Sequence, residues 1–270
     1  MPPIPQKTVI FFDIDGTLID NDTQVIPQSA IEAVKQLRAK GHIPVVNTGR
    51  PYAQIDPRIR AMDFAAWICS CGMEILLEGR WLSRSVPDTI LCAYVVQQAR
   101  RYDVRPLYES EDGSLVYDPQ LCGHPRQMLE MKQMLGKGFP VCSIEAHPSF
   151  QKFVSWDGDP LGTPRFHRAM APYFEIIHRG GGGFTEYVLK GHSKAQGMTA
   201  LLEHLGIPAG QALAIGDSTN DLPMFAVAGH TACLGGGMEE LKRRAEFVTA
   251  PVLEDGIAKA LAHFGLIEAV

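Results

Sequence analysis

At the start of the chain, apolar and polar positions follow two alternating patterns. Short apolar runs rich in Val, Ile and Phe are typical of buried parallel strands, and the longer segments between them have the spacing of amphipathic helices. The pattern predicts strands at 9–13, 43–47 and 66–70 and helices near 27–40 and 51–62. Because strands and helices alternate with short connections, we expect a parallel sheet covered by helices on both faces.

The pattern changes after Leu82 and returns at Lys194. In between, short strand-like runs at 115–117, 153–156 and 174–177 mix with helix-like segments near 88–102 and 125–136, which predicts an α+β unit. From 194 onward we expect helices at 194–205, 220–228, 238–245 and 256–265 and strands at 211–215 and 231–234. One α/β domain, residues 1–83 and 188–270, is therefore predicted to be interrupted by an inserted domain at 84–187.

Two carboxylates directly follow the first predicted strand. Residues 11–18 read Phe-Phe-Asp-Ile-Asp-Gly-Thr-Leu, so Asp13 and Asp15 lie two positions apart. Side chains two apart on an extended chain point the same way, so these carboxylates repel unless one is protonated or a cation neutralises them. Mg²⁺ is the usual cation for hard oxygen ligands, although Asp15 and Gly16 can also be interpreted as a simple turn.

A second acidic cluster follows the strand predicted at 211–215. It reads Gly-Asp-Ser-Thr-Asn-Asp, which places Asp217 and Asp221 four residues apart. Its alternative role is to cap the next helix, because Asp and Ser are frequent N-caps. In a parallel sheet, however, both strands end at the same edge, where α/β proteins bind ligands. Together the two clusters predict an Mg²⁺ site beside a substrate phosphate.

Two further segments offer groups that bind anions. Thr48 and Gly49 follow the second predicted strand, just where a helix is expected to begin near Pro51, and free N–H groups at a helix start attract anions. Thr48 would equally serve as the cap of that helix. Lys194 lies at another helix start, where a cation needs a carboxylate or phosphate partner. Lys190 is the rival candidate, and an ordinary solvated lysine is the alternative interpretation.

Composition and charge narrow the classes of partner. The 270 residues carry a net charge of -5, with 46% hydrophobic and 20% charged positions, as in an ordinary globular protein. This charge gives no electrostatic reason to expect nucleic acid or an anionic membrane as a partner. The sequence shows neither a signal-peptide pattern nor an apolar run of ~18 residues, so we expect a soluble cytoplasmic protein.

The order of these segments resembles a known family. Asp-x-Asp-Gly-Thr, Thr-Gly-Arg, a lysine at a helix start and Gly-Asp-x-x-Asn-Asp resemble the four motifs of the haloacid dehalogenase (HAD) superfamily of phosphohydrolases. The end of the chain, with Gly-Asp-Ser-Thr-Asn-Asp-Leu-Pro-Met and then Glu254-Asp255-Gly256, is similar to the Cof-like branch. The resemblance implies a Rossmann-like parallel-sheet core with an inserted α+β cap of class IIB. The chain departs from this branch at Cys71-Gly72-Met73, where many relatives have Asn-Gly-Ala.

The resemblance also implies roles for individual residues. Asp13 would attack phosphorus, and Asp15 would act as general acid and base. Mg²⁺ would be held by Asp13, Asp15, Asp217 and Asp221.

A second set of residues is implied to bind the phosphate or to orient the site. Its members are Gly16, Thr48, Gly49, Arg50, Lys194 and Asn220. Thr48 and Lys194 would also act in catalysis by opposing the negative charge of the transition state. Arg50 is explained equally well as a surface helix residue.

By resemblance we expect a Mg²⁺-dependent phosphatase that hydrolyses a small phosphomonoester through an aspartyl-phosphate intermediate. Its partner would be a small phosphorylated metabolite, either a sugar phosphate or a phosphorylated cofactor, and the protein would be a monomer or homodimer. Two alternatives stay open. One is a phosphosugar mutase on the same fold, and the other is a non-catalytic regulator that binds a phosphorylated metabolite.

Overall fold

The computed structural model describes residues 7–121, 139–156, 160–179 and 184–268, which form two compact units. The core unit contains the described chain up to Gly49, then Ile55–Arg84 and the described residues from Ser193 onward. The inserted unit contains Arg50–Gln54 and the described part of Ser85–His192.

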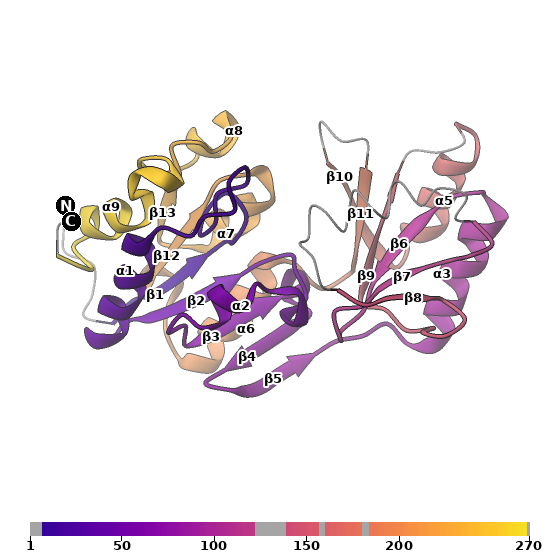
Figure 1. Cartoon of the computed structure of the whole chain (residues 1–270), viewed down its shortest axis with the longest axis horizontal. Coiled ribbons are helices and arrows are strands. Elements are labelled where there is room, and N and C mark those ends of the chain that lie inside the picture. Colours follow the sequence, from indigo (N-terminus) through magenta and orange to yellow (C-terminus); the bar gives the residue numbers. More distant parts are fainter. Residues whose placement is uncertain (1–6, 122–138, 157–159, 180–183, 269–270) are drawn as a thin grey trace. The chain divides into compact units, whose positions relative to one another are not determined.

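The core unit is built on an eight-stranded sheet (Figure 1). In chain order its strands are β1 (Val9–Phe12), β2 (Ile43–Asn47), β3 (Ala66–Cys69), β4 (Glu74–Leu77), β5 (Arg80–Arg84), β12 (Ala212–Gly216), β13 (His230–Cys233) and β14 (Phe247–Val248). Across the sheet they are ordered β14-β13-β12-β1-β2-β3-β4-β5. The strands from β14 to β3 pair in parallel, whereas β4 and β5 continue the sheet as antiparallel strands. β1 therefore lies between β12 and β2, and these three strands end at the same edge.

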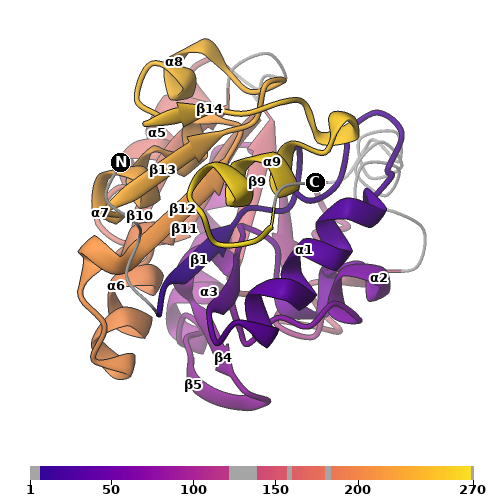
Figure 2. The same ribbon diagram turned by 90° about the vertical axis from the view of Figure 1, so that its left-hand side faces the viewer.

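Helices cover both faces of this sheet. They are α1 (Gln28–Ala39), α2 (Pro57–Arg60), α6 (Lys194–Leu205), α7 (Leu222–Val227), α8 (Glu239–Lys242) and α9 (Gly256–His263), with 3-10 turns η2 (Ser70–Gly72), η3 (Ala209–Gln211), η4 (Thr219–Asp221) and η5 (Val252–Glu254). Figure 2 shows α6 and α7 on one face and α1 and α9 on the other. Apolar side chains of α6 and α7 pack in one buried cluster with those of β1, β2 and β12. Burial on both faces explains why the central strands are unbroken apolar runs.

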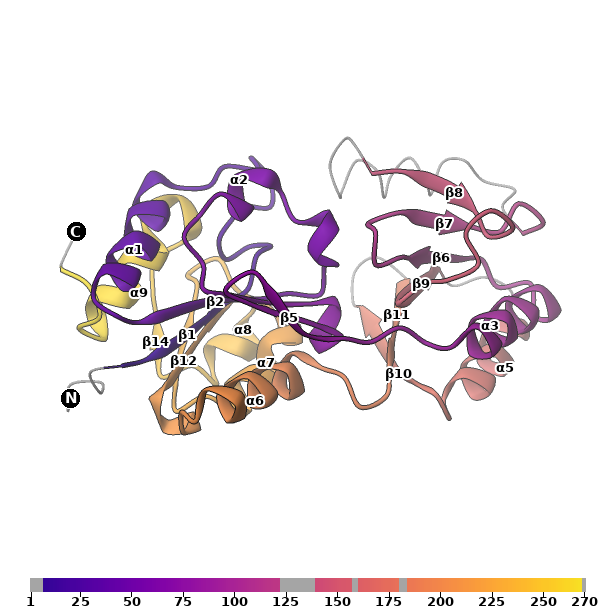
Figure 3. The ribbon, with the colours of Figure 1, turned by 90° about the horizontal axis from the view of Figure 1, so that it is seen from below.

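The inserted unit is a six-stranded sheet with helices on one face (Figure 3). Its elements are η1 (Tyr52–Gln54), α3 (Thr89–Arg101), β6 (Pro106–Glu109), β7 (Leu115–Tyr117), β8 (Val141–Ser143), β9 (Lys152–Trp156), α5 (Gly162–Met170), β10 (Phe174–Arg179) and β11 (Phe184–Leu189). The strand order is β10-β11-β9-β6-β7-β8, antiparallel except for the parallel pair β7 and β8. α3 and α5 pack on Tyr108, Phe153 and Tyr187 in one apolar cluster.

The predicted α/β class is confirmed, but the helix predicted over 51–62 is wrong. Only η1 and the four-residue helix α2 form there. Pro57 takes the first position of α2, and the Asp56 carboxylate caps it by accepting a hydrogen bond from the Arg58 N–H at 2.8 Å. A continuous helix cannot pass Pro57, because proline lacks the N–H and its ring collides with the carbonyl four residues earlier. The segment predicted as a helix at 220–228 is divided between η4 and the short helix α7. Within the helix predicted at 238–245, only α8 forms.

The edge of the core sheet differs from the expected all-parallel arrangement. β4 and β5 form a hairpin whose turn residues, Glu78 and Gly79, have φ angles of 44° and 75°. Positive φ at both central residues is what a two-residue hairpin turn of type I′ requires. The helix predicted near 125–136 lies outside the described residues. Within the described ranges, no helix combines the length and the apolar character that crossing a membrane requires.

Candidate active site

Three adjacent strands of the core unit end in polar residues. Asp13 follows β1, Thr48 follows β2, and Asp217 follows β12. The Asp13 N–H donates a hydrogen bond to the Ile215 carbonyl at 3.1 Å, which ties the first acidic cluster to the second. These polar residues therefore converge at one edge of the sheet, as expected for parallel strands.

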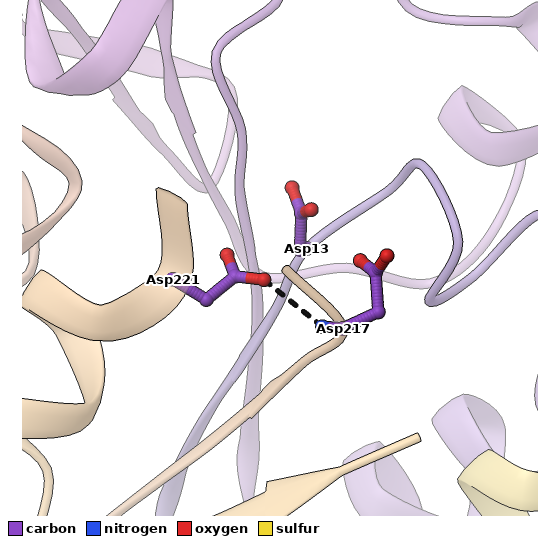
Figure 4. A group of neighbouring side chains, drawn as sticks. All are labelled: Asp13, Asp217 and Asp221. Atoms are coloured by element: carbon purple, nitrogen blue, oxygen red, sulfur yellow. Dashed lines mark hydrogen bonds between the residues drawn. The ribbon is translucent and has the colours of Figure 1, made fainter. Parts of the chain in front are cut away.

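Three carboxylates gather at this edge (Figure 4). One oxygen each from Asp13, Asp217 and Asp221 lies within 4.8 Å of the others. Asp13 and Asp221 are buried and Asp217 is half-buried. Carboxylate oxygens are the preferred ligands of small hard cations such as Mg²⁺, so the donor set fits this metal.

The Lys194 ammonium lies between two of these carboxylates. Its Nζ atom is 2.7 Å from Asp13 Oδ1 and 2.7 Å from Asp221 Oδ1. Lys194 is the first residue of α6 and is buried, so the two carboxylates compensate a charge that both burial and the helix dipole disfavour. Lys190, the rival candidate, is exposed and belongs to the inserted unit.

Asp221 is already engaged through both of its oxygens. Oδ1 contacts Lys194, and Oδ2 accepts hydrogen bonds from the backbone N–H groups of Asp217 at 3.0 Å and Ser218 at 3.2 Å. A Cβ atom on Gly216 would collide with this carboxylate. Asp221 is therefore suited to hold both the Lys194 ammonium and the turn after β12 in position.

Burial and mutual repulsion shift the protonation of the cluster. Burial raises the pKa of Asp13 well above its usual value; Lys194 opposes this shift, and Asp221, Asp217 and Asp15 add to it. Burial and the charge of Asp221 raise the pKa of Asp217 to about 7. Burial by itself would lower the pKa of Lys194, but Asp13 and Asp221 raise it above its ordinary value. This excess of negative charge is what a divalent cation would neutralise, which is a second sign that the site fits Mg²⁺.

Thr48 is buried at the end of β2. Its N–H donates to the Ile68 carbonyl at 2.8 Å, and its own carbonyl accepts from the Cys71 N–H at 3.1 Å. Gly49 follows it in the core unit, whereas Arg50 belongs to the inserted unit. The core unit thus brings Thr48 and Gly49 to the strand edge.

The remaining predicted residues lie in the loops after β1 and β12. Gly16 has a φ of +75°, and a Cβ atom there would overlap the Asp217 carboxylate, so this position requires glycine. Asp15 is half-buried. The Asn220 Oδ1 atom accepts a hydrogen bond from Ser218 Oγ at 2.7 Å, within the turn that begins α7.

Two residues that sequence reasoning did not single out join the cluster. Thr17 Oγ1 donates to Asp217 Oδ1 at 3.1 Å, and the signal that could have identified it is its place as the threonine of Asp-x-Asp-Gly-Thr. Asn47 Nδ2 donates to the Lys194 carbonyl at 3.1 Å. No pattern in the sequence signals this contact, because the two residues are 147 positions apart.

Known proteins are similar to this chain in sequence. A family model of the haloacid dehalogenase-like hydrolases matches residues 10–261. The putative phosphatase YkrA of Bacillus subtilis is 29% identical over 263 residues, which cover 96% of this chain and 98% of YkrA. The 5-amino-6-(5-phospho-D-ribitylamino)uracil phosphatase YitU of Bacillus subtilis is 24% identical over 275 residues, covering 95% and 97%.

Solved structures agree with these relatives. The structure of a HAD subclass IIB sugar phosphatase is 27% identical and matches with a TM-score of 0.79, covering 96% of this chain and 100% of that one. Family motifs and architecture thus coincide over nearly the whole chain. The protein therefore belongs to the haloacid dehalogenase-like hydrolase family, among its Cof-like phosphatases of class IIB.

Proposed function

We propose that this phosphatase hydrolyses a small phosphomonoester in a Mg²⁺-dependent reaction, through an aspartyl-phosphate formed on Asp13. The observation that supports this most is the position of the buried Lys194 ammonium, 2.7 Å from Asp13 Oδ1. An anionic nucleophile meets an anionic phosphate only if fixed positive charge offsets their repulsion. Lys194 supplies one such charge where the phosphate would arrive.

The metal would be held by the carboxylates of Asp13 and Asp217 and by the backbone carbonyl of Asp15. When bound, Mg²⁺ would neutralise the carboxylates and polarise a phosphoryl oxygen. Asp221 is assigned a different role, because Lys194 and two backbone N–H groups already occupy its oxygens. It would hold Lys194 in place.

The reaction follows in two steps. An Asp13 oxygen forms a bond to phosphorus while the bond from phosphorus to the leaving oxygen breaks, and Asp15 donates a proton to the departing alcohol. Asp15 then takes a proton from water, whose oxygen attacks phosphorus and releases phosphate and the free Asp13 carboxylate. Thr48 and Lys194 would bind the phosphoryl oxygens and oppose the charge that develops on them.

The substrate is proposed to be a small phosphorylated metabolite. YitU is named for a phosphate ester on a ribityl chain, and the subclass IIB structure is described as a sugar phosphatase. Both descriptions point to phosphate on a polyhydroxylated carbon chain. Sugar phosphates and 5-amino-6-(5-phospho-D-ribitylamino)uracil are therefore the first substrates to test, with pyridoxal phosphate and flavin mononucleotide as phosphorylated cofactors.

The test measures phosphate release from p-nitrophenyl phosphate and from this panel, with Mg²⁺ and with EDTA. We expect turnover that Mg²⁺ supports and EDTA abolishes. Running the reaction in ¹⁸O-labelled water separates a hydrolase from a mutase, because only hydrolysis transfers the label to released phosphate. Turnover that is insensitive to EDTA, or the absence of turnover on every compound, contradicts the proposal.

A further inference from the structure

The side chain of Asn47, the last residue of β2, holds the first residue of α6. Its Nδ2 atom donates a hydrogen bond to the Lys194 carbonyl at 3.1 Å and lies 3.8 Å from Met224 Sδ. Asn47 is 0% exposed, so water does not compete for this bond. The contact joins the end of a central strand to the backbone of the residue whose ammonium contacts Asp13.

The same side chain carries an unfavourable feature. Its Oδ1 atom is buried and meets no hydrogen-bond donor among the residues that the structure describes. A buried acceptor without a donor costs free energy, and an apolar side chain at this position would avoid that cost. Packing alone therefore does not account for an asparagine here, whereas its role as a donor to Lys194 does.

The first turn of α6 is held from another side by η2. Gly72 in η2 has a φ of +87°, and a Cβ atom on Gly197 of α6 would lie 2.9 Å from Gly72 Cα and 2.5 Å from Ile68 Cγ2. Ser193 caps the helix by accepting a hydrogen bond from the Gln196 N–H at 3.1 Å. These contacts fix the start of the helix, and the Asn47 bond fixes the Lys194 carbonyl itself.

We infer that Asn47 is a positioning residue that sets the place of the Lys194 ammonium beside the nucleophile Asp13. A lysine side chain is flexible, so the place of its ammonium depends on where the backbone is held. The ammonium lies 2.7 Å from both Asp13 Oδ1 and Asp221 Oδ1, and a small shift of the backbone would break this geometry. The inference rests on the proposed function, in which Lys194 binds the phosphoryl group.

The first test compares Asn47→Ala with Val45→Ala. Val45 is equally buried, lies two residues earlier on β2 and belongs to the apolar cluster that contains Met224, the neighbour of Asn47, so both substitutions leave a gap but only one removes the donor. With p-nitrophenyl phosphate and saturating Mg²⁺, we expect Asn47→Ala to lower kcat by about 10- to 100-fold, as misplacement of catalytic groups does. Val45→Ala should keep kcat within about threefold of the wild-type value, even if its melting temperature falls as much as that of Asn47→Ala.

If Asn47→Ala does not fold, Asn47→Leu replaces it. This variant keeps a similar side-chain size at a fully buried position and has no donor for the Lys194 carbonyl. The same loss of kcat is expected. A wild-type kcat in the folded variant, or an equal loss in Val45→Ala, overturns the positioning role.

The second test repeats Asn47→Ala in a Lys194→Ala background. Because Asn47 acts through Lys194, we expect no further loss of kcat there, in contrast to the loss in the wild-type background. If Asn47→Ala lowers kcat by the same factor in both backgrounds, the inference is overturned. If the background is too slow to measure, the comparison with Val45→Ala decides. A wild-type protein without any turnover overturns the proposed function and this inference together, whereas an active wild type with an unaffected Asn47→Ala overturns the inference alone.

Discussion

Asp217 and Asp221 are four residues apart in the sequence but have different surroundings. Asp221 is 0% exposed, and both of its oxygens accept hydrogen bonds from Lys194 or from backbone N–H groups. Asp217 is half-buried and accepts one from Thr17. We therefore expect Asp217 to bind the metal and Asp221 to hold the lysine.

Substituting each residue by asparagine tests this division. Asp217→Asn removes a charged ligand, so the Mg²⁺ concentration for half-maximal activity should rise by at least about tenfold. Asp221→Asn would place an amide beside the Lys194 ammonium, so kcat should fall by about 10- to 100-fold with little change in the Mg²⁺ requirement. Mg²⁺ titrations of phosphate release distinguish the two effects. An equal rise in the Mg²⁺ requirement for both variants would show that Asp221 is also a ligand.

The raised pKa of Asp217 predicts how pH affects stability without metal. Burial and Asp221 raise this pKa from 3.8 to about 7 in the folded protein. In the pH range between these values the folded protein keeps a proton that the unfolded chain releases, so stability is lost as pH rises toward about 7. In EDTA, the melting temperature of the wild type should therefore fall more between about pH 5 and about pH 8 than that of Asp217→Asn.

Asp22→Asn is the matched control for this measurement, because Asp22 is an exposed acid in the loop after the first cluster. Its pH dependence should equal that of the wild type. The same fall in the melting temperatures of Asp217→Asn and the wild type would mean that Asp217 does not titrate in this range.

At the scale of elements, the close contact between α6 and η2 makes a prediction about stability. A methyl group on Gly197 would meet Ile68 and Gly72, so Gly197→Ala should destabilise the fold by about 1–3 kcal/mol. Helix propensity by itself predicts the opposite sign, because alanine favours a helix over glycine by about 1 kcal/mol. Urea denaturation of Gly197→Ala measures which effect is larger.

Thr199→Ala is the control, because Thr199 is exposed on the same helix. Its free energy of unfolding should stay within about 0.5 kcal/mol of the wild type. Should Gly197→Ala be as stable as Thr199→Ala, the first turn of α6 is not tightly packed against η2.

Some elements were predictable because local and tertiary preferences agree. β1 and β12 are unbroken apolar runs that end in glycine or acidic residues, and α6 spans Lys194–Leu205, where the helix was expected. The helix over 51–62 was not predicted correctly, because the apolar spacing was given more weight than Asp56-Pro57, which marks the start of a new helix. The β4–β5 hairpin was not predicted, because its turn contains Glu78, and glutamate is an unusual residue at a positive φ.

For the whole molecule, the parallel order of β12, β1 and β2 explains why strand-end motifs far apart in the sequence could be expected to meet. The contacts that refine the site were not predictable in this way. The hydrogen bond from Asn47 to Lys194 depends on how α6 packs against β2. Likewise, no local pattern shows that Arg50–Gln54 belongs to the inserted unit, because this depends on contacts such as that of Gln54 Nε2 with the Gly113 carbonyl at 3.2 Å.

The central claim is that Asp13 is the nucleophile of a Mg²⁺-dependent phosphatase. The most direct test is the rate of p-nitrophenyl phosphate hydrolysis by Asp13→Asn in saturating Mg²⁺, beside the wild type and the Asp22→Asn control. We predict that Asp13→Asn loses at least about 1,000-fold in kcat, because an amide cannot form the aspartyl-phosphate, while Asp22→Asn keeps the wild-type rate. Wild-type turnover by folded Asp13→Asn would contradict the covalent mechanism.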